Sequence, residues 1–598
     1  ALLTVLLWGW LASASALPWT LALLGLLLTR PLLDSLLELL RKTTDVPFSE
    51  HLLAALRTSG TFFVRAGLSL AWLPFETNYS LDAILRTLWR LVVSKHRLLQ
   101  WNPSREEERT SADTLQAVYR EQWMQPALVL VLASVLSMQP RVLLLASPIL
   151  ALWLLGPALA WWLSRPRGQV TFTPLAEDLR FLHRLARSNW AFFDRHVGPE
   201  DNWLPPDNLQ EPPFASIAHR TSPTNMGMAL LSHLAAHDFG YLSAGRLFER
   251  LAQILDSMSR LERYRGHFYN WYDTQTLKPL SPQYVSAVDS GNLAALLLTL
   301  RPGLLEMADT PMLDQRLTLG LLDTFDTLLD AFSRSGRDAR EIEALREQVQ
   351  QAHERSGNLP VTQMSLLAEQ LPGLTPPSPG AEETDDCVFW LQALHTQCLD
   401  LCTELQGFQL PPGNDLAPQT PLSWRQLAEL EPGQWPLSER LAVSNVRALA
   451  RQRIAQAQAL ARRITTLATM DFTFLYDTHR DLFAIGYNAD EHRLDSAFYD
   501  LLASEMRLTN FAIIAQGQVP QDSWFALGRL LTSNSGVPVL LSWSGSMFEY
   551  LMPLLVMPSY EGTLLDQTCK AAVDRQIKHG NLLGIPWGVS ESAYNALD

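Results

Sequence analysis

Two glutamates stand in unusual segments near the C-terminal end of this 598-residue sequence. Glu505 follows the small and apolar run Leu-Leu-Ala-Ser, and Glu591 lies between two serines, close to Trp587 and Tyr594. Cleavage of a glycosidic bond takes two carboxyl groups, because one protonates the leaving oxygen while the other activates water or attacks the anomeric carbon. Partly apolar surroundings raise the pKa of a carboxyl group toward general-acid range. Glu505 and Glu591 are therefore candidate catalytic residues.

Other interpretations of these carboxylates stay open at this point. A glutamate at a helix N-terminus is also an ordinary capping residue, stabilised by the helix dipole. Four more carboxylates occupy segments of the same kind and compete for the catalytic role: Asp289, Asp495, Asp500 and Glu549.

Six segments of the chain interleave aromatic with polar residues. Aromatic faces pack on the apolar faces of glucose rings, and polar groups pair with the hydroxyls. Each segment taken alone is equally well a capped loop, but together they predict a sugar-binding cleft. The candidate substrate-binding residues are His267, Asn270, Trp271, Tyr272, Asp289, Asn292, Tyr487, Asn488, Arg507, Trp543, Glu549, Tyr550, Trp587, Tyr594 and Asn595.

The elements that must position these residues are helical. Apolar residues recur at helical spacing from about residue 175 onward, and Gly- or Pro-containing loops separate the periods. The spacing predicts helices over 179–197, 224–239, 243–263, 290–300, 313–332 and 337–351. The segments rich in aromatic residues recur at helix ends, which favours an all-α toroid of helix pairs, an (α/α)6 barrel. No G-x-G-x-x-G motif or P-loop is present, so nucleotide binding has no support.

The N-terminal third is apolar enough to enter a membrane. Residues 1–33 read as one kinked span or a tight hairpin split at Pro18, and 125–163 as a helical hairpin broken at 139–141. Residues 62–75 are too short to span and favour an interfacial or re-entrant segment. Residues 81–99 resemble a basic amphipathic helix on an anionic leaflet.

Charge divides the chain in the same way. Residues 1–167 carry 15 Lys and Arg against 11 Asp and Glu, whereas the remainder carries 32 against 50. Basic residues flank every predicted span, so the positive-inside rule predicts that these flanks and the acidic remainder face the cytoplasm. The acidic balance argues against a nucleic-acid partner.

The four cysteines carry little chemistry. Cys398 and Cys402 lie one helical turn apart with His395 nearby, but no second half of a metal site follows at a sensible spacing. We therefore expect buried apolar cysteines, a reducing compartment and no metal.

At the level of whole motifs the chain resembles the middle domain of bacterial cyclic β-1,2-glucan synthases, the glycoamylase-like region classed as glycoside hydrolase family 189. The resemblance rests on WLPPDNLQEPP with AHRTSPTN, RGHFYNWYDT, YVSAVDSGN, YDLLASEMRL, LSWSGSMFEYLMP and PWGVSESAYN. The run LPFETNYSLDAILRTLWRLVVSKHRLLQW is similar to the membrane segment that precedes this domain in the same synthases.

This resemblance implies an inner-membrane enzyme whose middle domain cyclises linear β-1,2-glucan by retaining transglycosylation. Its motifs place the family's two catalytic glutamates at Glu505 and Glu591. The resemblance also implies an N-terminal glycosyltransferase that uses UDP-glucose and a divalent metal, and a C-terminal phosphorylase-like domain, as partners within the same protein. This chain has no D-x-D or Q-x-x-R-W signature of the transferase, so we expect no cofactor here.

The expected organisation has four parts. Residues 1–167 form membrane and interfacial helices at the end of the transferase module, 168–303 the first part of the barrel, 304–465 a helical insertion, and 466–598 the second part. Because the sequence ends seven residues after Glu591, we expect the barrel to be incomplete at its C-terminal end.

Two other functions remain compatible with the sequence. A β-1,2-glucanase of the same fold would transfer the sugar to water, and a membrane-tethered glucan-binding module would do no chemistry. A transporter is disfavoured, because the spans are few and hold no deep charged residue.

Overall fold

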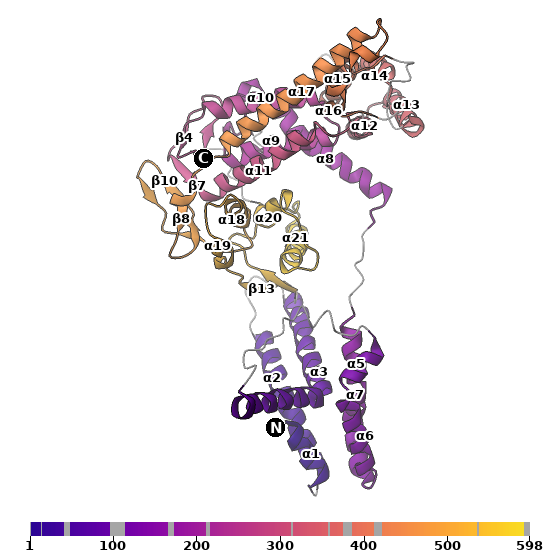
Figure 1. Ribbon diagram of the computed structural model, residues 1–598, viewed down its shortest axis with the longest axis vertical. Coiled ribbons are helices and arrows are strands. Elements are labelled where there is room, and N and C mark those ends of the chain that lie inside the picture. Colours follow the sequence, from indigo (N-terminus) through magenta and orange to yellow (C-terminus); the bar gives the residue numbers. More distant parts are fainter. Residues whose placement is uncertain are drawn as a thin grey trace. The chain divides into compact units, whose positions relative to one another are not determined.

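The structure is a computed structural model (Figure 1). It describes residues 2–13, 15–40, 48–95, 114–165, 173–210, 216–312, 315–356, 359–374, 386–411, 421–534 and 537–590. The chain divides into two compact units. The first holds residues 1–172 with 533–538, and the second holds residues 173–532 with 539–598.

The first unit is built of helices. They are α1 (Leu2–Leu11), α2 (Ala16–Leu40), α3 (Phe48–Trp89) with the π-helical turn Arg90–Ser94, α5 (Leu115–Glu121), α6 (Met124–Leu136) and α7 (Pro140–Leu163). Two of them, over Leu17–Leu40 and Pro140–Leu163, are long and apolar enough to cross a membrane.

The structure corrects three expectations for this unit. The break in residues 1–33 follows Leu11, and Pro18 lies in the first turn of α2, where a missing N–H costs no helical hydrogen bond. Residues 62–75 and 81–89 are not separate segments but parts of the continuous helix α3. Residues 96–99 lie outside the described residues. The predicted break at 139–141 is confirmed, since α7 begins at Pro140.

Buried polar side chains tie α3, α6 and α7 together. The Gln125 amide donates to the carbonyls of Ala71 (2.8 Å) and Trp153 (2.6 Å). The Trp153 indole donates to Leu70 O at 2.8 Å. Leucines on the outside of this unit stay exposed, Leu130 at 69% and Leu144 at 77%. An apolar exterior with polar N–H groups paired inside the unit suits a lipid environment.

The second unit is mostly helical too, and the predicted helices are confirmed, although α11 extends to Glu306 and α13 to Ser356, beyond the predicted ends. They are α8 (Ala176–His196), α9 (Pro223–Asp238), α10 (Ala244–Arg260), α11 (Ala287–Glu306), α12 (Arg316–Ser335) and α13 (Arg340–Ser356). Beyond them lie α14 (Val361–Gln370), α15 (Asp386–Gly407), α16 (Trp424–Glu429), α17 (Arg440–Leu467), α18 (Met506–Ala515), α19 (Asp522–Ala526), α20 (Met547–Leu551) and α21 (Leu564–Leu583). The helical class is thus confirmed, and the toroid of helix pairs stays a prediction.

Short antiparallel strands join the helix ends. The pairs are β1 (Leu209–Gln210) with β2 (Ser216–Ile217), β3 (Arg220–Thr221) with β6 (Tyr272–Asp273), β4 (Arg263–Tyr264) with β5 (His267–Phe268), and β13 (Leu531–Asn534) with β14 (Val537–Leu540). Two sheets have three strands: β11 (Arg493–Leu494), β10 (Gly486–Asn488) and β7 (Tyr284–Ser286), and β12 (Phe498–Tyr499), β9 (Leu482–Ala484) and β8 (Tyr476–Asp477).

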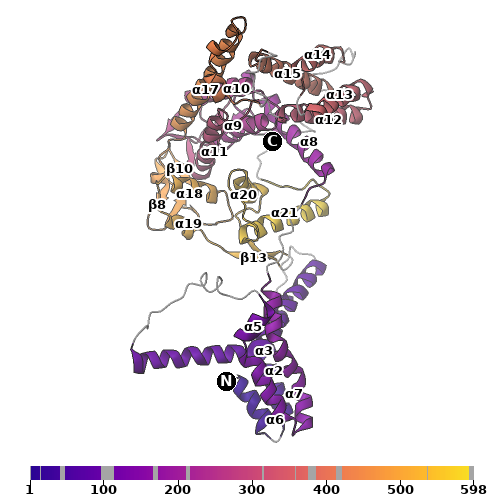
Figure 2. The same cartoon turned by 45° about the vertical axis from the view of Figure 1, so that its right-hand side comes forward.

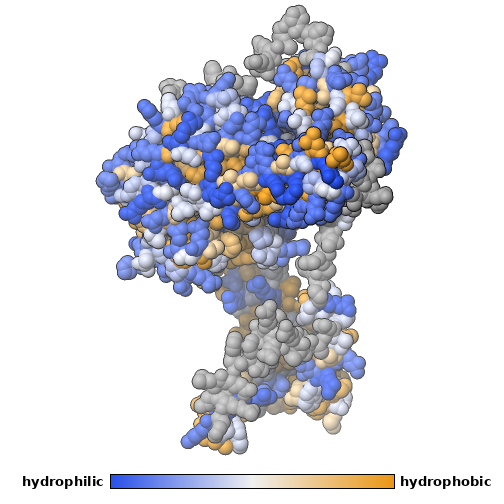
Figure 3. Space-filling model, turned by 45° about the horizontal axis from the view of Figure 1, so that its top comes forward, coloured by the Kyte–Doolittle hydropathy of each residue, from blue (hydrophilic) through white to orange (hydrophobic). Residues whose placement is uncertain are grey.

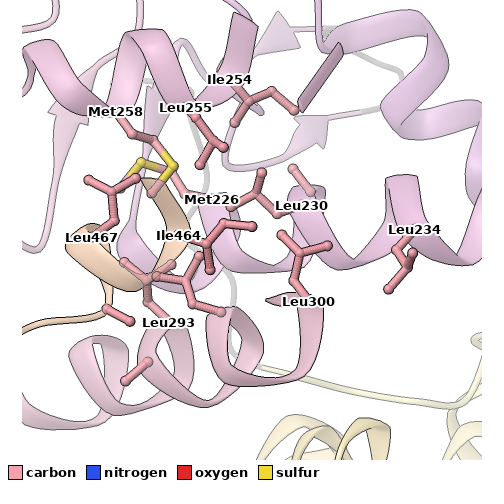
Figure 4. Packing of buried hydrophobic residues seen from close by; sticks show 14 of the residues in the cluster. Met226, Leu230, Leu234, Ile254, Leu255, Met258, Leu293, Leu300, Ile464 and Leu467 are labelled. Atoms are coloured by element: carbon pink, nitrogen blue, oxygen red, sulfur yellow. The ribbon is translucent and has the colours of Figure 1, made fainter. Parts of the chain in front are cut away.

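The main core of the second unit lies where α9, α10, α11 and α17 run side by side (Figure 2). Met226, Leu230 and Leu234 follow one face of α9 at intervals of four residues. They meet apolar side chains from the three neighbouring helices (Figure 4). A stripe at this spacing buries one side of a helix, so the core fixes how the N-termini of α9 and α11 are presented.

A second core joins α12, α13, α14 and α15, within the stretch predicted to be an insertion. Three of the four cysteines contribute to it, and all four are buried without disulfides, as expected. Helices α16 and α17 pack into the main core instead. The surface seen in Figure 3 is mainly hydrophilic over the second unit, with hydrophobic residues in small groups.

Candidate active site

Three helix N-termini bring candidate residues together. Thr224 lies in the first turn of α9, Asp289 and Asn292 lie in the first two turns of α11, and Glu505 is the residue before α18. Serine caps set the starts of the first two helices: Ser222 accepts from Asn225 N, and Ser286 accepts from Asp289 N. The positive ends of three helix dipoles therefore surround these carboxylates.

A series of hydrogen bonds links Asp289 to Glu505. Thr224 Oγ1 donates to Asp289 Oδ1 at 2.7 Å, and Asn292 Nδ2 lies 3.2 Å from Thr224 Oγ1 and 2.7 Å from Glu505 Oε2. These three hydrogen bonds in series hold the carboxyl groups of Asp289 and Glu505 close to one another. Asn292 itself is fully buried, whereas Asp289 and Glu505 are partly buried.

Burial raises the pKa of Asp289, with the nearby negative charge of Asp207 adding to the rise and hydrogen bonds from Ser286 and Thr224 opposing it. Arg507 affects the same region from the other side. Its side chain is buried and donates to the carbonyls of Ser504 (3.0 Å), Glu549 (3.0 Å) and Tyr550 (2.5 Å). Its guanidinium also attracts the charge of Glu505. Arg507 therefore joins α18 to α20 beside Glu505.

Close packing of α11 on α18 brings Asn292 to Glu505. A Cβ on Gly291 would lie 2.0 Å from Thr509 Oγ1, far inside van der Waals contact. Only glycine lets the two helices approach this closely.

A positively charged side chain lies between Asp207 and Trp271. Arg220 donates to Asp207 Oδ2 at 3.0 and 3.2 Å, and its guanidinium stands 5.2 Å from the centroid of the Trp271 ring. Asn225 Nδ2 donates to Asp207 Oδ1 at 3.1 Å. The sequence reasoning missed Asp207, Arg220, Thr224 and Asn225 as site residues. Their segments carried the only available signal, polar residues beside Trp203 and Pro205–Pro206.

The strand β7 leads directly into α11 and carries a second group of candidates. Asn488 is opposite Tyr284 in the β7–β10 register, and Asn270 N donates to Tyr284 O at 2.7 Å. Tyr487 stacks on Tyr264, with ring centroids 5.3 Å apart. The structure thus places Asn270 and Asn488 beside β7, the strand that leads into α11.

Two candidates lie in the core instead. His267 is fully buried with ring centroids 4.7 Å from Phe472 and 5.5 Å from Phe474. Burial lowers the pKa of His267 to about 4, so the neutral ring donates through Nε2 to Asp471 O at 2.7 Å. Tyr272 is also fully buried and donates to Glu262 O at 2.5 Å.

Glu549 holds a loop together. Its carboxylate accepts from the backbone N–H groups of Trp543 (3.0 Å), Ser544 (2.9 Å) and Gly545 (3.1 Å). The Tyr550 hydroxyl donates to Leu540 O at 3.0 Å. These bonds present Trp543, which is 54% exposed, to solvent.

A neighbouring loop leads toward the second glutamate. Met547 N donates to Val589 O at 3.1 Å, and Val589 N donates to Gln576 Oε1 at 3.0 Å. Trp587 on this loop is 51% exposed. Glu591, Tyr594 and Asn595 lie outside the described residues, so their predicted roles stay predictions.

One curated protein matches this chain along its whole length. The chain is 32% identical over 614 residues to the cyclic beta-(1,2)-glucan synthase NdvB of Rhizobium meliloti (strain 1021). The match covers 100% of this chain and 20% of that protein, so the chain spans about a fifth of its relative. The resemblance expected from the motifs is confirmed, although no family model matches the chain.

Two solved structures are distantly similar. A putative glucoamylase from Bacteroides fragilis NCTC 9343 aligns with 70% of this chain and 69% of its own at 11% identity and a TM-score of 0.34. One from Bacteroides caccae ATCC 43185 aligns with 67% of this chain and 69% of its own at 12% identity and a TM-score of 0.33. Scores this low support no conclusion about this chain.

Proposed function

Because the whole chain aligns with one fifth of a cyclic β-(1,2)-glucan synthase, we propose that it is the corresponding segment of such an enzyme and that it acts on β-1,2-glucan. The reaction would be retaining transglycosylation that closes linear chains into rings. The observation that carries the proposal is the set of hydrogen bonds that presents Glu505 at the N-terminus of α18, beside Asn292 and the linked Asp289.

In the proposed reaction Glu505 and Glu591 form the catalytic pair. One carboxyl group protonates the departing 2-oxygen while the other carboxylate attacks the anomeric carbon, so the glycosidic C–O bond breaks and a glycosyl ester forms. The 2-hydroxyl at the far end of the same glucan then attacks that carbon. Its proton passes to the first carboxylate, the ester oxygen leaves and the ring closes. The roles of the two glutamates remain interchangeable here.

The proposed supporting residues have distinct tasks. Asn292 holds Glu505 through its amide and orients the carboxylate. Trp271, Trp543 and Trp587 offer ring faces for glucose units, since each is partly or largely exposed. The proposed location is the inner membrane with the second unit in the cytoplasm, because basic residues flank the apolar helices. Other domains of the same synthase are the proposed partners, and no cofactor is proposed for this segment.

An exchange experiment tests the proposal. The matching fifth of NdvB is replaced by this chain, and membranes carrying the hybrid receive UDP-glucose. Mass spectrometry separates rings, which are whole multiples of an anhydroglucose unit, from linear chains that contain one extra water. The proposal predicts rings from the hybrid and none from its Glu505→Gln or Glu591→Gln variants. Glu561→Gln, on an exposed loop, is the matched control and should still give rings.

Other products would point to other functions. Short linear chains would indicate a β-1,2-glucanase. Rings that persist in both catalytic variants would mean that this segment binds glucan without reacting, and would contradict the assignment of both glutamates.

A further inference from the structure

The first half of α8 presents its apolar side to solvent. Leu179, Phe181, Leu182 and Leu185 are 44%, 57%, 51% and 46% exposed. These four residues, here named the α8 apolar face, share one side of the helix. Among the residues that the structure describes, none covers this face. In Figures 1 and 2 the N-terminal end of α8 extends beyond the helices of its unit.

The opposite side of the same helix packs on the protein through polar contacts. His183 Nδ1 lies 2.9 Å from Asp323 Oδ2, and Arg187 Nε donates to Thr324 Oγ1 at 2.9 Å. Arg180 and Arg184 line a polar groove between α8, α12 and α13. The usual arrangement of a surface helix, with its apolar side inward, is therefore inverted.

An exposed apolar face on a helix whose other side packs through polar contacts is typical of a binding surface for a protein, a ligand or a membrane. Asp178, which lies among the apolar residues of this turn, is already engaged: its Oδ2 accepts from Leu175 N at 3.0 Å and closes the first turn of the helix. The remaining surface is made of Leu and Phe without hydrogen-bonding groups, which suits acyl chains better than a polar ligand.

The position of α8 in the sequence identifies the occupant. The apolar helix α7 ends at Leu163, and residues 164–175 join it to α8. Fully extended, that stretch covers only about 40 Å. Arg165 stands 3.7 Å above the Trp161 ring at the end of α7, and this pair of residue types is typical of a membrane–water interface. The start of α8 is thus within reach of the lipid surface from which α7 emerges.

We propose that the α8 apolar face lies in the interfacial region of the bilayer and anchors the second unit to the membrane surface. Polar contacts to α12 hold the helix against its own unit, while the four apolar side chains enter the acyl boundary. The inference rests on α7 lying in the membrane and not on the proposed chemistry.

The test uses the full chain reconstituted into phosphatidylcholine–phosphatidylglycerol vesicles. A single cysteine in place of Leu182 carries an environment-sensitive fluorophore, and the four native cysteines are buried and should not react. The matched control carries the same probe at Glu177, an exposed position that lines the polar groove. Flotation of the vesicles reports insertion of the chain separately.

The proposal predicts a blue-shifted probe at 182 that loses emission when brominated lipids are included, with little loss at 177. A floating chain whose probe at 182 responds to aqueous iodide and not to brominated lipid would overturn it. A probe at 182 that is shielded from both quenchers would mean that protein covers the face, which also overturns it. A chain that does not float with the vesicles would contradict the proposal, because α7 would then not lie in the membrane. Ring formation is measured in a different assay, so the proposed function and the membrane anchor can fail independently of one another.

Discussion

Replacing Asn292 with alanine should slow the reaction as well as weaken the fold. Asn292 Nδ2 donates to Glu505 Oε2 at 2.7 Å from a fully buried position. A hydrogen bond to a charged group contributes about 1.5–3 kcal/mol. If the bond orients Glu505 in the transition state, its loss lowers the rate about 10- to 150-fold. The assay is ring formation by the NdvB hybrid, followed over time at saturating UDP-glucose.

The matched control is Asn510→Ala, which lies in α18, the helix that begins directly after Glu505. Asn510 is also fully buried, and its Oδ1 accepts from Ser523 Oγ at 2.5 Å. Both variants should lose about 1–3 kcal/mol of unfolding free energy, measured by urea denaturation. Only Asn292→Ala should lose rate. Equal rate losses in both variants would mean that Asn292 acts through stability alone, and full activity of Asn292→Ala would refute the role of this hydrogen bond.

Three more predictions follow from single residues. Burial lowers the pKa of His233 from 6.5 to about 4, so the unfolded chain binds more protons than the folded chain between these pH values, and acid destabilises the fold. The variant His233→Gln should therefore lose about 2 kcal/mol less unfolding free energy than the parent chain between pH 7 and pH 5, and an equal loss in both proteins would refute this prediction. Gly291→Ala should lower the free energy of unfolding by about 1–3 kcal/mol in thermal melts, because the added Cβ would overlap with the Thr509 side chain. The control Gly433→Ala should leave this free energy unchanged, because open space surrounds Gly433. Trp543→Ala should weaken binding of linear β-1,2-glucan in calorimetry by about 1–2 kcal/mol, and the control Tyr560→Ala, 68% exposed, should bind normally.

The sequence predicted the helices of the second unit because helical periodicity is local. Residues four apart, such as Met226 and Leu230, show their shared face without any knowledge of the neighbours. The same reasoning placed Glu505 at a helix start, which the structure confirms. It failed at Pro18, because proline disrupts a helix only beyond its first turn.

The site was only partly predictable because its links join residues far apart in the sequence. The bonds from Thr224 to Asp289 and from Asn292 to Glu505 depend on how α9, α11 and α18 pack. Composition singled out His267 as a polar residue among aromatic ones, yet it lies in the core beside Phe472. The orientation of α8 could not be predicted either. Amphipathic spacing shows that a helix has an apolar and a polar face, but it does not show which face packs against the rest of the protein.

The most direct test of the central claim asks where oxygen from water goes. The NdvB hybrid is supplied with linear β-1,2-glucan in water enriched in the heavy isotope of oxygen, and the products are weighed by mass spectrometry. Transglycosylation predicts rings that contain no heavy oxygen, because a sugar hydroxyl and not water attacks the anomeric carbon. Linear products with one heavy oxygen for each new reducing end would contradict the account and show that the segment hydrolyses its glucan.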